Sequence, residues 1–415
     1  MQRRHFIQQA CAVGGWTCWS SARAATDALL ARRKLVVIML RGAVDGLSVV
    51  APYAEPAYAQ SRSTIALAAP GADDGLLKLD SRFGLHPALA RLKPFWDQGA
   101  MSFIHASGSP DSTRSHFDAQ DYLESGTPGR KSTTDGWMNR LLACLPGPTS
   151  PTRAVSMGAT PPRIFAGAAN VATLGLGPRA LDAKIIDDPR MQAALDKLYA
   201  QDSGMAPTYK SASEGRSEMK RSMAGHAMGA GAPMDPGADN GAASATSFAA
   251  DARRLGLLIH KDPHTQLAFS AVGGWDTHVN QGGARGQLAN RLASLGAGLE
   301  ALAQGLGDSL QNTVIVVLSE FGRTLRQNGT GGTDHGRGNV IWLLGGPVAG
   351  GQVLGEWPGL DAAALVDGRD LAVTTDFRAV LSPLLRQHLG LGDEALARVF
   401  PGFSAVMAGQ LLRRA

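Results

Sequence analysis

The chain has few cysteines, the residues whose disulfides stabilise many small secreted proteins. It contains three cysteines among 415 residues, and Cys11 and Cys18 both lie near the N-terminus. If that end is removed, Cys144 alone remains, which excludes an intrachain disulfide framework. Hydrophobic residues make up 44% of the chain and charged residues 18%. This balance is typical of a large globular chain with a sizeable core and excludes a disordered protein.

Long hydrophobic runs are also missing beyond the N-terminal region. No later stretch approaches the roughly 18 apolar residues that a membrane span needs, so we expect no integral membrane segment. Removing residues 1–24 takes away Arg3, Arg4 and Arg23 and no acid, so the formal charge of +5 becomes +2. So small a charge excludes a strongly basic nucleic-acid-binding protein.

The N-terminus has the three parts of an export signal. Arg3 and Arg4 open it, an apolar stretch follows over residues 10–20, and Ala22-Arg23-Ala24 closes it. A basic pair, an apolar region and small residues at the cleavage position are typical of the twin-arginine route. We therefore expect residues 1–24 to be a twin-arginine signal peptide and residues 25–415 to be a periplasmic protein.

Apolar runs alternate with helical spacing along the rest of the chain. Residues 313–318 form a near-continuous run rich in β-branched side chains, which is typical of a parallel strand buried on both faces. Similar runs at 34–40, 101–106, 266–272 and 340–344 predict further strands. Helical spacing separates them, for example at 86–98, 247–260 and 285–306. The pattern predicts an α/β fold: a doubly wound, mostly parallel sheet flanked by helices.

One stretch has a different composition. Residues 203–247 contain five methionines, many small residues, one aromatic residue and neither leucine nor isoleucine. Such a stretch cannot bury a core of its own, so we expect a low-complexity insertion, disordered or flexible, within the α/β domain of residues 25–415.

Acids and histidines follow several of the predicted strands. In an open α/β sheet, ligands bind outside the carboxyl ends of the strands, so these side chains are expected to share one edge. Carboxylates and imidazoles without thiolates suit zinc, manganese or a harder cation. We therefore predict a site for one or two divalent metal ions. Its candidate ligands are Asp45, Asp276, His278, Glu320, Asp334 and His335.

A second group of residues is typical of anion binding. Ser115 precedes an expected helix, with Asp118 three residues on, so its hydroxyl either caps the helix or attacks a bound ester. Arg114 beside it and Arg323 have guanidinium groups that could orient an anion. These three residues are the catalytic candidates, and Ser109 and Ser112 are the alternative nucleophiles.

Several motifs together resemble a known family. They are LRGAVDGL, SRFGLHPAL, RSHFDAQDYLESGTPG, GGWDTHVNQG, VVLSEFGRTLRQNGTGGTDHGRGN and GRDLAVTTDFRAVL. At these residues the chain is similar to the exported bacterial family of domain of unknown function 1501, a branch of the alkaline phosphatase and sulfatase-like superfamily. The resemblance implies an alkaline phosphatase-like fold, two divalent metals and a Ser, Thr or modified Cys nucleophile. It also implies metal-ligand roles for Asp45, Asp276, His278 and His335.

The chain departs from that superfamily in two places. Glu320 and Phe321 stand where the superfamily has an adjacent Asp-His, so one imidazole is missing. The sulfatase motif Cys-x-Pro-x-Arg is also missing, which argues against a formylglycine sulfatase.

Two functions are compatible with these observations. The first is a metal-dependent hydrolase that acts on a small phosphate or sulfate ester. The second is a non-catalytic periplasmic protein that keeps the fold as a scaffold for an exported partner, because folds often outlive their chemistry.

Overall fold

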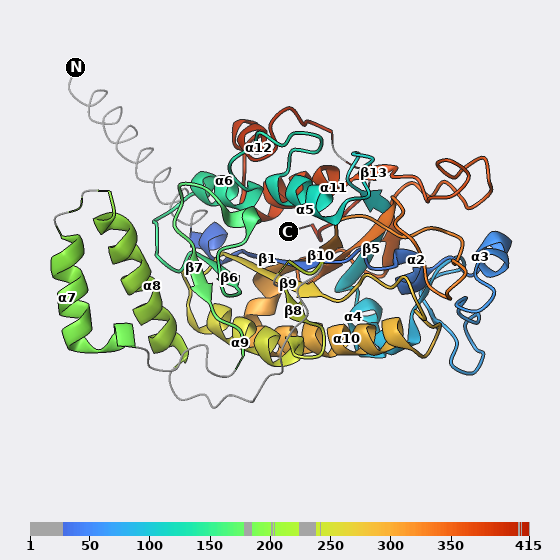
Figure 1. Cartoon of the computed structure of the whole chain (residues 1–415), viewed down its shortest axis with the longest axis horizontal. Helices are drawn as coiled ribbons and strands as arrows, with labels where there is room; N and C mark the ends of the chain where they lie inside the picture. The colour runs from blue at the N-terminus through green and yellow to red at the C-terminus, as the bar shows by residue number, and fades with distance from the viewer. Residues whose placement is uncertain are drawn as a thin grey trace, which may run out of the picture.

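The chain forms a central sheet between two layers of helices (Figure 1). The computed structural model describes residues 28–177, 185–200, 202, 204–223, 238–240, 242–405, 407 and 409–414. The expected signal peptide lies outside these residues. Within them the main sheet has ten strands. They are β1 (Lys34–Leu40), β5 (Met101–Gly108), β6 (Ala154–Met157), β7 (Ala172–Leu174), β8 (Ala243–Ser244), β9 (Leu267–Gly273), β10 (Thr313–Ser319), β11 (Asn339–Leu344), β12 (Gln352–Leu354) and β13 (Thr375–Asp376).

The strands of this sheet are mostly parallel. Their order is β12-β5-β11-β10-β1-β9-β6-β7, with β13 beside β5 and β8 beside β9. Strand β1 pairs in parallel with β10 and β9, so Leu40 lies opposite Ser319 on one side and Val272 on the other. Strand β11 runs antiparallel to both β10 and β5. The predicted fold class, a mostly parallel sheet flanked by helices, is confirmed.

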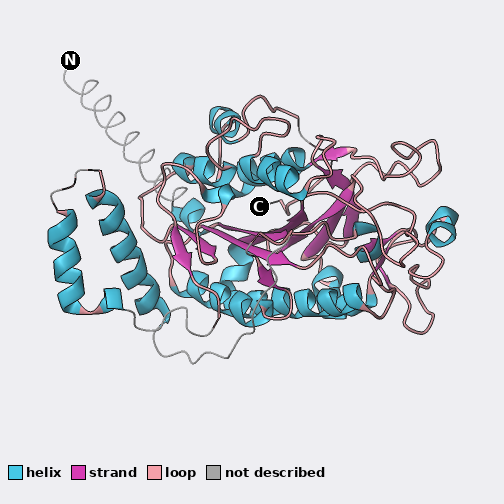
Figure 2. Cartoon of the chain, viewed as in Figure 1, coloured by secondary structure: helices cyan, strands magenta, loops and turns pink. Residues whose placement is uncertain are grey.

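Helices cover both faces of the sheet (Figures 1 and 2). One face carries α4 (Lys93–Asp97), α9 (Phe248–Lys261) and α10 (Gln287–Leu306). The other carries α5 (His116–Ser125), α6 (Trp137–Cys144), α11 (Phe377–Leu389) and α12 (Asp393–Val399). Alternate residues of β1 enter the two cores: Val36 and Ile38 share a cluster with residues of α10, and Leu35 and Val37 share one with residues of α11. Both faces are covered, which explains the continuous apolar run.

Smaller elements lie around this framework. A three-stranded sheet consists of β2 (Val50–Ala51), β4 (Gly84–Leu85) and β3 (Leu77–Lys78). Helices α2 (Gly46–Val49) and α3 (Pro56–Ser61) lie near it, and α7 (Pro189–Tyr199) and α8 (Ala206–Met223) stand side by side at the far end of the molecule (Figure 1). Within the described residues, no helix is both long and apolar enough to cross a membrane.

Two regions differ from the expected local structure. The helix expected over residues 86–98 is a 3-10 helix, η1 (Pro87–Leu92), followed by the short α4, with non-helical dihedral angles at Leu89. Pro94 lacks the N–H that would continue a longer α-helix across this point. In the insertion, residues 206–223 form α8 rather than an irregular segment. Its alanine, glutamate, lysine, arginine and methionine residues are good helix formers, and Tyr209 stacks on Tyr199 of α7.

Candidate metal centre

Loops from five strands meet at one edge of the main sheet. The loops after β1, β5, β9 and β10 leave the carboxyl ends of parallel strands. Strand β11 runs the other way, so the loop that precedes it reaches the same edge. This is the edge at which open α/β sheets bind ligands. The chain direction therefore brings residues far apart in sequence to one place.

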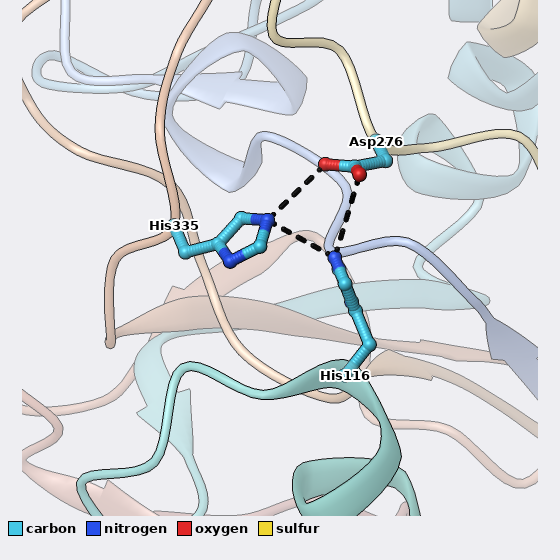
Figure 3. Close-up of side chains that lie close together, drawn as sticks. All are labelled: His116, Asp276 and His335. Carbon is cyan, nitrogen blue, oxygen red and sulfur yellow. Dashed lines mark hydrogen bonds and ion pairs between the residues drawn. The ribbon is translucent and has the colours of Figure 1, made fainter. Parts of the chain in front are cut away.

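His116, Asp276 and His335 form a compact cluster at this edge (Figure 3). One ligand atom from each residue lies within 4.8 Å of the others. The Nε2 atoms of His116 and His335 are 3.0 Å apart. The carboxylate of Asp276 lies beside both, with Oδ2 3.6 Å from Nε2 of His116 and Oδ1 3.3 Å from Nε2 of His335. Two imidazoles and a carboxylate are a common set of metal ligands.

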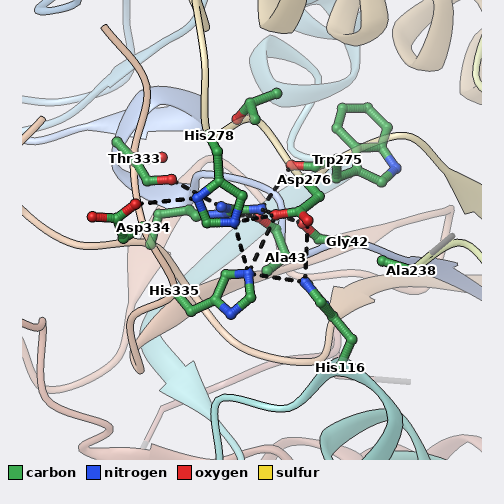
Figure 4. A network of polar contacts seen from close by, with 12 residues as sticks. Gly42, Ala43, His116, Ala238, Trp275, Asp276, His278, Thr333, Asp334 and His335 are labelled. Carbon is green, nitrogen blue, oxygen red and sulfur yellow. Dashed lines mark hydrogen bonds and ion pairs between the residues drawn. The ribbon is translucent and has the colours of Figure 1, made fainter. Parts of the chain in front are cut away.

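His278 adjoins this cluster from the loop after β9 (Figure 4). Its Nε2 lies 2.9 Å from Oδ1 of Asp276 and 3.0 Å from Nε2 of His335. His335 therefore stands between two other imidazoles. Its single Nε2 can carry at most one proton, so it cannot donate to both neighbours.

The second nitrogen of each imidazole is held by an oxygen acceptor. Nδ1 of His116 is 2.8 Å from Oε1 of Glu320, and Nδ1 of His278 is 3.1 Å from Oδ1 of Asp334. Nδ1 of His335 is 2.9 Å from the carbonyl oxygen of Arg114. Since a carbonyl or carboxylate oxygen accepts, each Nδ1 carries a proton, and each Nε2 is the nitrogen left to bind a metal ion once it has lost any proton. Hydrogen bonds of this kind orient the histidine ligands of metals.

The three imidazoles and the carboxylate of Asp276 are stable this close together only if a positive charge lies among them. Nitrogen lone pairs and a carboxylate about 3 Å apart repel one another unless a proton or a metal ion lies among them. Burial opposes the charged form of His116, but its contacts with Asp276 and Glu320 outweigh burial and raise its pKa to about 9. Burial likewise opposes ionisation of Asp276, yet contacts with His116, His335 and Arg323 lower its pKa well below the usual range. The residues present fit a divalent cation.

Glu320 is part of the centre through His116. Its side chain is fully buried, and Oε1 also accepts hydrogen bonds from the backbone N–H of Gly42 at 2.8 Å and from Gln120 at 3.1 Å. Burial opposes its ionisation, but the bond from His116 lowers its pKa. The predicted ligand Glu320 thus acts in this structure as the carboxylate that orients a histidine.

Sequence reasoning missed His116. His116 lies on α5, and the centroid of the Phe321 ring is 4.9 Å from that of His116 and 5.1 Å from that of His335. The available signal was its position: His116 is the first residue of the helix that follows β5, and β5 ends at the same edge of the sheet.

The structure places Asp45 apart from the histidines. Its Oδ2 accepts from Arg62 Nη1 at 2.6 Å, from Ser48 at 2.7 Å and from Gln281 at 2.8 Å, and its Oδ1 accepts from Arg62 Nη2 at 3.0 Å. Both charged side chains are fully buried. Burial opposes ionisation, but Arg62 lowers the pKa of Asp45. Asp45 stabilises the β1 loop as half of a buried ion pair.

Gln281 connects that pair to the candidate metal centre. Its Oε1 accepts hydrogen bonds from Thr277 and Thr333, both at 2.8 Å, while its Nε2 donates to Asp45. Thr277 lies between Asp276 and His278. Thr333 directly precedes Asp334, so the amide fastens together the two loops that carry these side chains.

The two catalytic arginine candidates are both engaged with protein groups. Arg323 is buried and donates to the carbonyl oxygens of Ala43 at 2.7 Å, Thr333 at 2.9 Å and Gly42 at 2.6 Å, and to Asp276 at 2.5 Å. Arg114 donates to the buried Asp370 at 2.5 Å. Arg323 thus holds Asp276 and the neighbouring loops together, whereas Nε of Arg114 makes no hydrogen bond among the described residues.

The serine candidates lie on the loop after β5. Ser115 is the N-cap of α5, and its exposed Oγ accepts from the N–H of Asp118 at 3.5 Å. Ser112 is exposed, and the buried Ser109 accepts from the N–H of Asp111 at 3.3 Å. The capping role of Ser115 is confirmed, and the nucleophile remains a prediction.

Fold and site together define an α/β protein with a histidine- and carboxylate-rich candidate metal centre at the edge of its sheet. A family model matches residues 32–400. The chain belongs to this family, which is described as protein of unknown function DUF1501. Comparison with curated protein sequences finds no significant match.

Solved structures with a similar course of the chain share little sequence. The complex titled Ps i-CgsB with k-i-k-neocarrahexaose has 11% identity and a TM-score of 0.40, with 90% of this chain and 74% of that one covered. The PsFucS1 sulfatase from Pseudoalteromonas sp. has 15% identity and a TM-score of 0.37, covering 87% and 68%. The alkaline phosphatase from the Antarctic bacterium TAB5 has 14% identity and a TM-score of 0.30, covering 78% and 93%.

Proposed function

We propose that this protein is a metal-dependent hydrolase of phosphate or sulfate esters. The observation that carries the proposal is the orientation of three histidines, each held at Nδ1 by an oxygen and each presenting Nε2 toward Asp276. His116, Asp276 and His335 would hold a divalent ion, with His278 as the adjoining ligand. Such an ion acts as a Lewis acid toward a phosphoryl or sulfuryl oxygen.

The chain's own residues would hold the metal ligands in the orientation that binding needs. Glu320 and Asp334 fix the tautomers of His116 and His278, and Arg323 holds Asp276 in place. Ser115 stays the candidate nucleophile of this proposal, because its hydroxyl is exposed one residue before His116.

Metal analysis is the first test. Purified protein is expected to contain zinc, manganese or a similar ion, and His116→Ala and His335→Ala are expected to lose it. His264→Ala is the matched control, because His264 is exposed on a loop outside the cluster. Aryl phosphate and aryl sulfate turnover should be lost on chelation and restored by metal. Wild-type protein that binds no divalent ion at neutral pH would overturn the proposal.

Ser115→Ala tests the nucleophile separately. Loss of the cap alone costs about 1 kcal/mol of stability, so loss of turnover in a folded Ser115→Ala variant with its metal retained would assign the attack to this hydroxyl. Unchanged turnover would exclude it.

A specific observation favours a second candidate, a binding protein without catalysis. Arg323 is fully buried and occupied by Asp276 and by carbonyl oxygens, so it is not free to bind an ester. In that case the metal would stabilise a surface for an exported partner. Metal binding without turnover of any aryl phosphate or sulfate would favour this function.

The site of action is also part of the proposal. An export signal at residues 1–24 would deliver the protein to the periplasm, where anionic esters and exported proteins are available. Fractionation of cells that express the full chain, compared with an Arg3→Lys/Arg4→Lys variant, tests it: the wild type should be periplasmic and the variant retained inside.

A further inference from the structure

A polar cleft lies at the opposite edge of the main sheet from the histidine cluster. It has a volume of about 760 Å³, within the range of about 300–1,000 Å³ typical of small-molecule sites. Its walls include Arg33 before β1, the end of the 3-10 helix η4 (Gly307–Asn312) that leads into β10, and Pro347 after β11. The C-terminal segment from Gly409 closes it. These are the amino ends of β1 and β10, whereas the histidine cluster follows their carboxyl ends.

Among the described residues that line this cleft there are arginines but no acidic residues. The lining residues include Arg33, Arg413 and Arg414 and neither aspartate nor glutamate. Among the described residues none of these three arginines forms an ion pair, whereas the buried Arg41 and Arg62 each pair with a carboxylate. Three like charges around one cavity repel one another, and an anion there would relieve that repulsion.

Two of the arginines are held in place by backbone oxygens. Nη1 of Arg33 donates to the carbonyls of Gln387 at 2.7 Å and His388 at 3.1 Å. Nε of Arg413 donates to Val348 at 3.1 Å, and its Nη2 donates to Gly99 at 2.7 Å. A carbonyl orients a guanidinium group but does not neutralise it. The charges are therefore positioned before any ligand arrives, which lowers the entropic cost of binding.

The backbone that carries Arg413 is also fixed. The N–H of Arg413 donates to the carbonyl of Pro347 at 2.8 Å, and that of Ala349 donates to Leu411 at 2.9 Å. This short ladder attaches the C-terminal segment to the loop after β11. The cleft is thus built by segments that the fold itself brings together.

We propose that this cleft binds a small anionic molecule that carries a phosphate, sulfate or carboxylate group together with hydroxyl groups. Guanidinium forks match the oxygens of all three anions. The side-chain amides of Gln311, Asn312, Gln387 and Gln410 line the same cavity and can donate to and accept from hydroxyls. The site is separate from the histidine cluster and does not depend on the proposed hydrolase activity.

Calorimetric titration of the full chain tests this proposal. The probes are inorganic phosphate, inorganic sulfate and glucuronate, at low ionic strength because salt screens exposed charges. Arg33→Gln/Arg413→Gln is expected to weaken binding about tenfold or more. Arg414→Gln makes the same test, and Arg414 forms no side-chain hydrogen bond within the part of the chain that the structure describes. Arg91→Gln is the control, because Arg91 is an exposed arginine paired with Glu300 elsewhere.

The outcomes separate the two sites. Binding that survives His116→Ala but weakens in the Arg33, Arg413 and Arg414 variants supports the cleft, and the preferred probe identifies the anionic group. Equal affinity in wild type and in both arginine variants overturns the proposal, as does the absence of binding at about 10 mM of every probe.

Discussion

Glu320 accepts a hydrogen bond from Nδ1 of His116 at 2.8 Å, across 204 residues of sequence. The carboxylate is fully buried, and it comes from the strand end, while the imidazole comes from the first turn of α5. This bond leaves Nε2 of His116 directed at Asp276 and His335. The candidate metal centre thus depends on a pair in which the acid orients and the histidine binds.

Replacing this acid should weaken the centre without removing a ligand. Glu320→Gln keeps the size of the side chain but loses the negative charge, so the pKa of His116 should fall from about 9. We expect metal affinity to drop by about 10- to 100-fold. A competition titration against a chromophoric chelator measures it. Glu300→Gln, a change at a half-buried glutamate of α10 outside the cluster, is the control, and equal affinity in both variants would contradict the orienting role.

Replacing Asp45 tests whether this buried carboxylate stabilises the fold rather than binding metal. Asp45→Asn leaves the guanidinium of Arg62 buried without a counter-charge. The free energy of unfolding should fall by about 3–5 kcal/mol, measured by urea denaturation. The folded variant should still bind metal with wild-type stoichiometry.

A paired replacement provides the control for that change. Asp45→Leu/Arg62→Met removes both charges and should recover part of the lost stability. Loss of metal from folded Asp45→Asn protein would instead return Asp45 to the set of ligands.

A substitution at Arg323 tests whether this residue holds the loops together or contacts the substrate. Arg323→Lys keeps the charge but cannot reach the carbonyls of Ala43, Gly42 and Thr333 together with Asp276. We expect a loss of at least about 2 kcal/mol, because buried carbonyls lose their donors, and weaker metal binding. Thermal unfolding and metal titration measure the two effects. Arg326→Lys, an exposed neighbour, should change neither, and a rise in KM alone would contradict the holding role.

Buried neutral histidines should make the protein sensitive to acid. Burial lowers the pKa of His86, His105 and His388 from 6.5 to about 4 in each case. Below pH 6.5 the unfolded chain therefore binds protons that the folded chain refuses, and stability falls as the pH drops toward 4. Each histidine contributes up to about 3 kcal/mol to this loss.

Denaturant unfolding at several pH values between 7 and 4 measures this loss. His388→Gln should reduce the slope of stability against pH in that window. His264→Gln, a change at an exposed histidine, should leave the slope as it is. A flat profile for the wild type would contradict the neutral buried state.

The sequence determined the features that depend on neighbouring residues. The β-branched run at 313–318 predicted β10 because a strand covered on both faces needs apolar side chains throughout, and all of its residues are buried. Ser115 and Asp118 predicted the start of α5 because a cap acts within one helical turn. Asp276, His278 and His335 were found because acids and histidines after strands share an edge.

Only the tertiary structure decided which of those side chains meet. Asp45 and Glu320 both follow buried strands, yet the first pairs with Arg62 and the second with His116. The antiparallel β11 returns His335 to the common edge. The partner of a buried charge is whichever group the fold brings within about 3 Å, and neither a bond across 17 residues nor one across 204 leaves a periodic signal in the sequence.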